Sequence, residues 1–116
     1  MRRLRVLSLL ILLLAACGKS APPPAPAAAA PLPPAAPAIQ KIFDTTCRGC
    51  HAVPASGAPQ AGDTAAWAPR VAQGRDTLLN HTVNGFQRMP PMGMCTQCSE
   101  EDFTALIEYM SRARLN

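Results

Sequence analysis

Apolar side chains recur at helical spacing in three stretches of the chain. The first stripe begins just after Pro37 and consists of Ile39, Ile42, Phe43 and Cys47. The second lies within residues 76–84, before the expected stop at Gly85, and consists of Leu78, Leu79, Thr82 and Val83. The third consists of Phe103, Leu106, Ile107 and Met110. Each stripe predicts an amphipathic helix with one buried face.

The third helix has the clearest ends. Ser99 can cap it together with Asp102 three residues later, which is the spacing of a capping box. A shorter helical turn is predicted over residues 64–68, ending before Pro69, because proline interrupts helical hydrogen bonding. No alternation typical of strands appears, so the sequence predicts an all-α fold with three main helices and short turns.

The length of the chain limits how much core it can build. Of 116 residues and 13 prolines, eight prolines fall between Pro22 and Pro37 in a Pro/Ala-rich, low-complexity segment that we interpret as a solvated tether. The domain predicted over residues 39–116 is therefore about 78 residues long, a size at which a disulfide, metal or cofactor is usually needed for stability. Aromatic residues make up only 4% of the chain, so a non-protein group is expected to fill part of the core.

The first residues are typical of an export signal. Three arginines precede an apolar run over residues 6–14, which is too short to span a bilayer. The run ends in Leu14-Ala15-Ala16-Cys17, which resembles the lipobox of bacterial lipoproteins. We expect a signal peptide over residues 1–16, lipid on Cys17 and a tether over residues 17–38. The alternative is an ordinary cleaved signal with a coincidental cysteine.

The expected location is the periplasmic face of a membrane or the cell surface. Gly18 after the cysteine resembles the default outer-membrane sorting of Gram-negative lipoproteins, but the choice between inner and outer membrane stays open. Without the three leader arginines, eight basic and seven acidic side chains remain. This near-neutral balance, with no basic run, gives no support for nucleic-acid binding.

The chemistry-bearing motif is Cys47-Arg48-Gly49-Cys50-His51, the C-x-x-C-H pattern of covalent haem c attachment. The two thiols can form thioethers with the vinyl groups on one porphyrin edge, and His51 can then ligate the iron. Zinc is the main alternative, because Cys95 and Cys98 form a second C-x-x-C. However, 44 residues separate the pairs, against about 15–20 in common zinc ribbons. In an oxidising compartment Cys95 and Cys98 remain to pair with each other, in a structural role or a redox-active one.

Residues 39–116 resemble a class I monohaem cytochrome c, most like the cytochrome c₅ branch. Besides the haem motif, the similar stretches are Gly57-Ala58-Pro59, Ala66-Trp67-Ala68-Pro69-Arg70, Met89-Pro90-Pro91, Cys95-Thr96-Gln97-Cys98-Ser99 and Glu108-Tyr109-Met110. The resemblance implies that Met89 is the sixth iron ligand and that Cys95 and Cys98 form a disulfide. It also implies that the Pro59 carbonyl accepts a hydrogen bond from the second ring nitrogen of His51.

Each of these roles has a competitor. Met92 and Met94 are close enough to Met89 to be rival ligands, and His81 is either a second axial histidine or simply solvated or packed. Trp67 is expected to pack on the porphyrin, with its N–H reaching a propionate, and Arg70 to pair with a propionate or face solvent. Phe43 and Tyr109 are expected to pack where the first and last helices cross. There Ile39 stands where class I cytochromes often have a small residue.

The function that follows is one-electron transfer without bond chemistry, because His51 and Met89 would fill both axial positions of the iron. Redox partners, membrane-bound or periplasmic oxidoreductases, would dock weakly at an exposed haem edge, with Arg48, Arg75 or Arg88 at the rim. A weak homodimer through the same edge stays open. The alternatives are a five-coordinate haem sensor or peroxidase-like ligand binder, and a zinc-binding structural module.

Overall fold

A computed structural model describes residues 34–116 of the chain. Its helical elements are α2 (Pro37–Ile42), η1 (Phe43–Cys47), α3 (Arg48–His51), η2 (Pro54–Ser56), α4 (Thr64–Val71), α5 (Arg75–Asn84), η3 (Pro91–Met94) and α6 (Glu100–Ser111). No strand forms among these residues, which confirms the all-α prediction. The predicted signal peptide, Cys17 and most of the predicted tether lie outside the described residues. Within residues 34–116, no helix is both long enough and apolar enough to cross a membrane.

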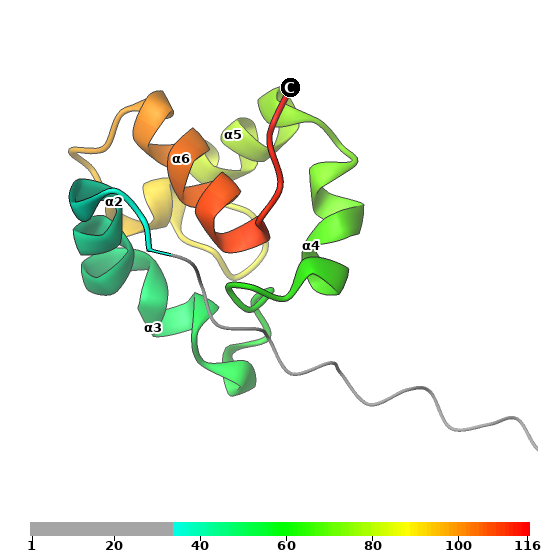
Figure 1. Cartoon of the computed structure of the whole chain (residues 1–116), viewed down its shortest axis with the longest axis horizontal. Coiled ribbons are helices and arrows are strands. Elements are labelled where there is room, and N and C mark those ends of the chain that lie inside the picture. The colour runs from blue at the N-terminus through cyan, green and yellow to red at the C-terminus, as the bar shows by residue number, and fades with distance from the viewer. Residues whose placement is uncertain (1–33) are drawn as a thin grey trace, which may run out of the picture.

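The last helix is the centre of the domain. In Figure 1, α6 runs through the middle of the fold, and it contacts α2, α4 and α5. Its buried side chains include the whole stripe predicted from the sequence: Phe103, Leu106, Ile107 and Met110. Because this one helix supplies so much of the core, its exact start and end fix the position of its neighbours.

The predicted capping box of α6 is confirmed. The Ser99 hydroxyl accepts the Asp102 N–H at 3.2 Å, and the Asp102 carboxylate accepts the Ser99 N–H at 3.0 Å. At the other end, Arg112 adopts a left-handed φ of 59° and its N–H returns to the Glu108 carbonyl. The helix is thus bounded at both ends by local hydrogen bonds that satisfy otherwise unpartnered backbone groups.

The predicted crossing of the first and last helices is also present. The rings of Phe43 and Tyr109 meet edge to face, with centroids 5.3 Å apart and planes at 78°. The Tyr109 hydroxyl donates to the Gln40 side-chain oxygen at 2.8 Å. Ile39 is half-buried and packs against the buried core. The crossing therefore accommodates the larger residue at this position.

The first helical stretch changes its winding before the cysteine motif. Phe43–Cys47 form a π-helical segment, in which the Arg48 N–H bonds the Phe43 carbonyl five residues back. The hydroxyls of Thr45 and Thr46 donate to the carbonyls of Lys41 and Ile42. Such back-bonding competes with the regular amide bonds and bends helices. The sequence pattern did not predict this wider turn, although Cys47 still packs against the core as expected.

The prediction that the short α4 helix ends before Pro69 is wrong. The helix continues to Val71, with Pro69 inside it. The Asp63 carboxylate caps its start by accepting the Ala66 N–H at 3.0 Å, and Trp67 is buried. Proline removes one helical hydrogen bond, but the helical bonding resumes after it, since the Ala72 N–H donates to the Ala68 carbonyl at 3.0 Å.

Candidate functional site

The cysteine–histidine motif lies at the end of the first helical stretch. Cys47 and Cys50 are both free thiols, one half-buried and the other exposed. Residues three apart on a helix lie on neighbouring turns of one face, so the two sulfurs can reach a common group. Burial raises the pKa of the Cys47 thiol, although a hydrogen bond with the Thr46 hydroxyl acts in the opposite direction. Cys47 is therefore held as a neutral thiol.

His51 is buried, at 7% exposure, beside these thiols. Its Nδ1 lies 2.8 Å from the Pro59 carbonyl oxygen. Because a carbonyl only accepts, Nδ1 carries the hydrogen, and Nε2 is the nitrogen with a lone pair for a metal. Burial lowers the pKa of His51, the hydrogen bond to Pro59 acts against this, and the charge of Arg70 lowers it further. The imidazole is thus kept neutral, the form that binds metals.

Trp67 forms one wall of the histidine site. Its ring stacks on His51 with centroids 5.7 Å apart and planes at 24°. Its Nε1–H donates to the Gln60 main-chain carbonyl at 3.0 Å. Indole has a single N–H, and in this structure the main chain engages it, so a contact with a haem propionate stays a prediction. Trp67 thereby connects the histidine to the loop that follows it.

Arg70 stands one turn further along α4. It is half-buried, and its Nη1 donates to the Ala66 carbonyl. A guanidinium has five N–H donors, so this bond leaves others for a carboxylate. Pairing of Arg70 with a propionate stays a prediction.

Gln60, which the sequence pattern did not single out, organises the loop between α3 and α4. Its side-chain amide lies 2.8 Å from the Ala58 carbonyl, 3.2 Å from that of Val53 and 3.3 Å from that of Cys50. The only sign in the sequence was its place directly after Pro59. A glutamine at a loop position is ordinarily solvated, and its partners here are main-chain carbonyls that no residue pattern reveals.

Met89 lies in a tight turn that follows α5. Phe86 and Met89 exchange both of their backbone hydrogen bonds, at 3.0 and 2.9 Å. Met89 is half-buried. Phe86 packs flat on His81, with ring centroids 4.0 Å apart and planes at 20°. His81 therefore takes the packed role that was one of its two predicted alternatives, and it supports the turn.

Gly85 brings this turn close to the end of α5. It adopts a φ of 84°, and an added Cβ would lie 3.0 Å from the Met89 carbonyl oxygen and 3.1 Å from the Pro91 nitrogen. Both contacts are with backbone atoms, which cannot swing aside as a side chain can. The glycine that the sequence predicted as a helix stop also sets how closely the methionine turn approaches the helix.

The other two methionines of the segment lie in different environments. Met92 packs against the buried core, whereas Met94 is 74% exposed. The Met89 methyl carbon lies 3.3 Å from where a Cβ on Gly93 would stand. Met89, which is half-buried, is thus neither largely solvated, like Met94, nor packed against the buried core, like Met92.

Cys95 and Cys98 are joined in a disulfide, with Cα atoms 5.4 Å apart. Both are buried, at 1% and 9% exposure, directly before the cap of α6. Since each sulfur is bonded to the other, this C-x-x-C offers no thiolate to zinc. Within residues 34–116, no group of three or more His, Cys, Asp or Glu side chains is arranged to hold a metal ion.

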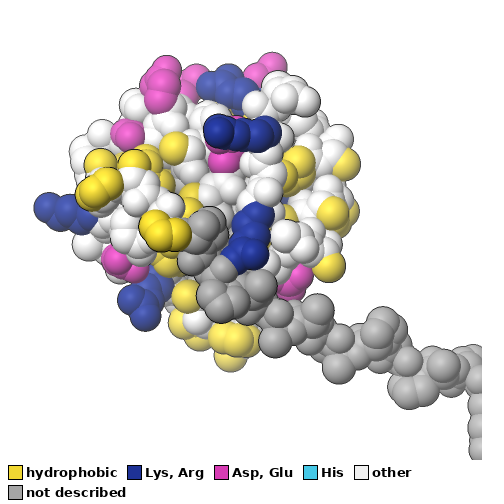
Figure 2. Space-filling model, in the orientation of Figure 1, with side chains coloured by type: hydrophobic (Ala, Val, Ile, Leu, Met, Phe, Trp, Pro, Cys, Tyr) yellow, Lys and Arg dark blue, Asp and Glu magenta, His cyan; other side chains and the backbone are white. Residues whose placement is uncertain are grey.

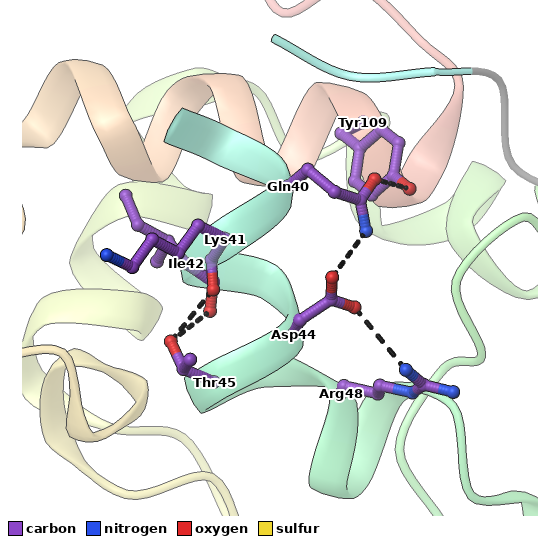
Figure 3. A network of polar contacts seen from close by, with 7 residues as sticks. All are labelled: Gln40, Lys41, Ile42, Asp44, Thr45, Arg48 and Tyr109. Carbon is purple, nitrogen blue, oxygen red and sulfur yellow. Dashed lines mark hydrogen bonds and ion pairs between the residues drawn. The ribbon is translucent and has the colours of Figure 1, made fainter. Parts of the chain in front are cut away.

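Arg48, inside the cysteine motif, belongs to a chain of polar contacts that reaches α6 (Figure 3). Tyr109 donates to Gln40 at 2.8 Å, Gln40 donates to Asp44 at 3.0 Å, and Asp44 pairs with Arg48 at 3.5 Å. The Arg48 side chain is 65% exposed. Its charge is therefore paired within its own helical stretch.

Comparisons with known proteins agree with this arrangement. Residues 34–110 match the family described as "Cytochrome C oxidase, cbb3-type, subunit III". The chain is 39% identical over 72 residues to cytochrome c5 of Ectopseudomonas mendocina, covering 60% of this chain and 83% of that protein. The chain belongs to the class I cytochromes c and is c₅-like.

Solved structures show the same relationship. A mono-haem ferrocytochrome c from Shewanella putrefaciens matches this cytochrome with a TM-score of 0.59 and 43% identity, over 66% of this chain and 94% of that one. A chain in the crystal structure of an electron-transfer complex of nitrite reductase with cytochrome c matches with a TM-score of 0.59 and 38% identity, over 68% and 96% of the two chains.

The residues of the motif fit one covalently bound haem c, the cofactor of this family. Two free thiols stand one helical turn apart, and the adjacent histidine is buried with its hydrogen fixed on Nδ1. This donor set suits thioether attachment and axial ligation through Nε2. The cytochrome is an electron-transfer protein rather than an enzyme.

We expect Gly85→Ala to cost more stability than Gly74→Ala. Both glycines have left-handed φ, 84° and 88°, but an added Cβ at Gly74 meets nothing within 4 Å. Backbone strain should cost each variant about 1–3 kcal/mol, and crowding against Met89 and Pro91 should cost Gly85→Ala roughly 1–3 kcal/mol more. Guanidinium titration of the holoprotein measures both losses; equal losses would show that the close approach to the turn is unimportant.

Proposed function

We propose that this cytochrome is a one-electron carrier whose haem iron has His51 and Met89 as axial ligands and which is held outside the cytoplasm by lipid on Cys17. The observation that carries the ligation is the hydrogen bond from His51 Nδ1 to the Pro59 carbonyl, at 2.8 Å. It directs Nε2 to the iron and makes the imidazole a better donor. Bound haem c supplies the one-electron Fe(III)/Fe(II) chemistry.

The surroundings of the three methionines support Met89 as the second axial ligand. Met94 is 74% exposed, and Met92 is half-buried with its side chain packed against the core. Met89 is half-buried in a turn closed by two backbone hydrogen bonds. Prolines at the two following positions restrict the backbone further. A thioether held by so many constraints can keep its place in both oxidation states, as a carrier requires.

Lipid anchoring is supported by the sequence. The basic start, the short apolar run and the small residues before Cys17 together fit the lipobox of exported bacterial lipoproteins. Two or more acyl chains give stable membrane attachment. The Pro/Ala-rich segment that follows would let the domain reach partners away from the bilayer surface.

Partners are proposed to be oxidoreductases that dock weakly. A relative occurs in an electron-transfer complex of nitrite reductase with cytochrome c. On the face shown in Figure 2, basic and acidic side chains are interspersed rather than gathered into one patch. Docking on such a surface depends little on long-range charge and more on a few local contacts.

Arg88 is the most suitable cation for this docking. Of the three arginines predicted at the rim, Arg48 pairs with Asp44 and Arg75 with Asp76. Within residues 34–116, Arg88 makes no ion pair. Its guanidinium lies beside Gly57, in the loop after the haem motif, and Phe86 in the same turn is 45% exposed. A partner that presents a carboxylate beside an apolar surface would fit this pair.

Met89→Leu tests the ligation. The variant should lose the weak long-wavelength sulfur-to-iron band of the oxidised protein, bind CO when reduced, and have a lower reduction potential, because a thioether favours ferrous iron. Met92→Leu and Met94→Leu should keep the band. If Met89→Leu retains it, another residue is the ligand; if the unaltered protein lacks it and binds CO readily, the sensor alternative is supported.

Cys17→Ser tests the anchor. In a Gram-negative host, the unaltered protein should fractionate with membranes and carry the mass of its acyl chains, whereas Cys17→Ser should lack this mass and leave the lipoprotein pathway. Ser20→Ala is the control and should behave like the unaltered protein. Release of the unaltered protein as a soluble, unlipidated form would rule out the anchor.

Arg88→Gln tests the docking cation. Oxidation of the reduced variant by ferricyanide, a small anionic oxidant, should be about two- to fivefold slower than that of the unaltered protein at low salt, and the difference should disappear at high salt. Arg114→Gln removes the same charge from a residue that pairs with Glu108 on α6, and it should have a smaller effect. Equal slowing in both variants would mean that net charge matters and the position of Arg88 does not.

A further inference from the structure

The carbonyl that accepts the hydrogen bond of the axial histidine lies in a loop without regular structure. Pro59 follows η2 and precedes α4, so no helix or sheet ladder fixes the direction of its carbonyl. Nevertheless its oxygen lies 2.8 Å from His51 Nδ1. Something outside regular secondary structure must therefore hold this peptide group in place.

The carbonyls on both sides of Pro59 are held. Before it, the Ala58 carbonyl accepts the Gln60 side-chain amide at 2.8 Å. After it, the Gln60 carbonyl accepts the Trp67 indole N–H and the Asp63 N–H, each at 3.0 Å. Because the ring fixes the φ of proline itself, little rotation is left to the Pro59 carbonyl.

The Gln60 side chain extends this restraint back to the haem motif. Its amide also lies within 3.2 Å of the Val53 carbonyl and 3.3 Å of the Cys50 carbonyl. One side chain thus joins Cys50 in the motif helix, Val53 at the start of the loop and Ala58, the residue before Pro59. The next residue, Ala61, donates its N–H to the His51 carbonyl. The loop therefore contacts His51 twice, at its ring through Pro59 and at its main chain through Ala61.

We propose that Gln60 is a positioning residue for the axial histidine: its side-chain amide holds the loop so that the Pro59 carbonyl stays on His51 Nδ1, and it thereby helps to set the reduction potential. This inference rests on the proposed ligation by His51. A hydrogen bond to Nδ1–H increases the electron donation of the imidazole. More donation favours ferric iron, so the restraint lowers the potential, and its loss raises it.

Gln60→Met is the informative variant, because methionine is of similar length and uncharged but has no N–H. Two measurements on the reduced holoprotein are needed: the exchange rate of the His51 Nδ1 hydrogen by NMR, and the reduction potential. We expect exchange roughly tenfold faster, the size of effect given by losing one ordinary hydrogen bond, together with a more positive potential. Neither change is expected from a residue that only stabilises the loop.

Two further variants complete the experiment. Gln73→Met removes a similar exposed contact, an amide 3.3 Å from the Pro69 carbonyl, and should change neither measurement. Gln60→Lys restores N–H donors and should return the exchange rate towards that of the unaltered protein. Its potential is left out of the comparison, because the added charge itself raises the potential.

The outcomes separate this proposal from the proposed function. If the unaltered protein shows the sulfur-to-iron band but Gln60→Met leaves both the exchange rate and the potential unchanged, the positioning role is overturned while the carrier stands. If Gln60→Met is less stable to unfolding but keeps the exchange rate and the potential of the unaltered protein, the positioning role is overturned as well. Absence of haem from the unaltered protein would instead overturn the proposed function.

Discussion

The hydrogen bond between His51 and Pro59 is the constraint on which the rest of the site depends. It decides which imidazole nitrogen carries the hydrogen, and therefore which nitrogen has a lone pair available to a metal. The bond joins the end of α3 to a loop eight residues later, and the loop in turn is fastened to α4 through Trp67. A contact between two atoms thus orients His51 and connects α3, which carries the histidine, with the loop that leads to α4.

The histidine side and the methionine side of the site are built on different physical principles. On the histidine side, hydrogen bonds between main chain and side chains hold a loop in place, with a stacked tryptophan behind it. On the methionine side, the restraint is steric: Gly85 allows backbone atoms to approach more closely than any side chain would permit. Hydrogen bonds define a direction, whereas close packing defines a distance. A nitrogen donor must be aimed and a thioether must be brought near, so each restraint suits the axial role proposed for His51 and Met89.

Features that depend on periodicity or local spacing could be predicted from the sequence. The buried face of α6, its capping box and the crossing of Phe43 with Tyr109 follow from residues a few positions apart, or from a resemblance that covers the domain. The predictions failed where tertiary contacts outweigh local preference. Pro69 is tolerated inside α4, where the Asp63 cap and the buried Trp67 hold the turn that precedes it. Two neighbouring threonines bond back to main-chain carbonyls in the widened turn before Cys47. Gln60 acts through carbonyls, which have no sequence signature.

The solvent exposure of the four cysteines in the domain also affects how they can react. Two pairs with identical spacing are in opposite redox states, Cys47 and Cys50 as free thiols and Cys95 and Cys98 as a disulfide. Cys50 is open to solvent, whereas the sulfurs of Cys95 and Cys98 are enclosed by the core. A reductant in solution therefore reaches Cys50 far more easily than the buried disulfide. Two pairs with the same spacing are thus distinguished by solvent access alone.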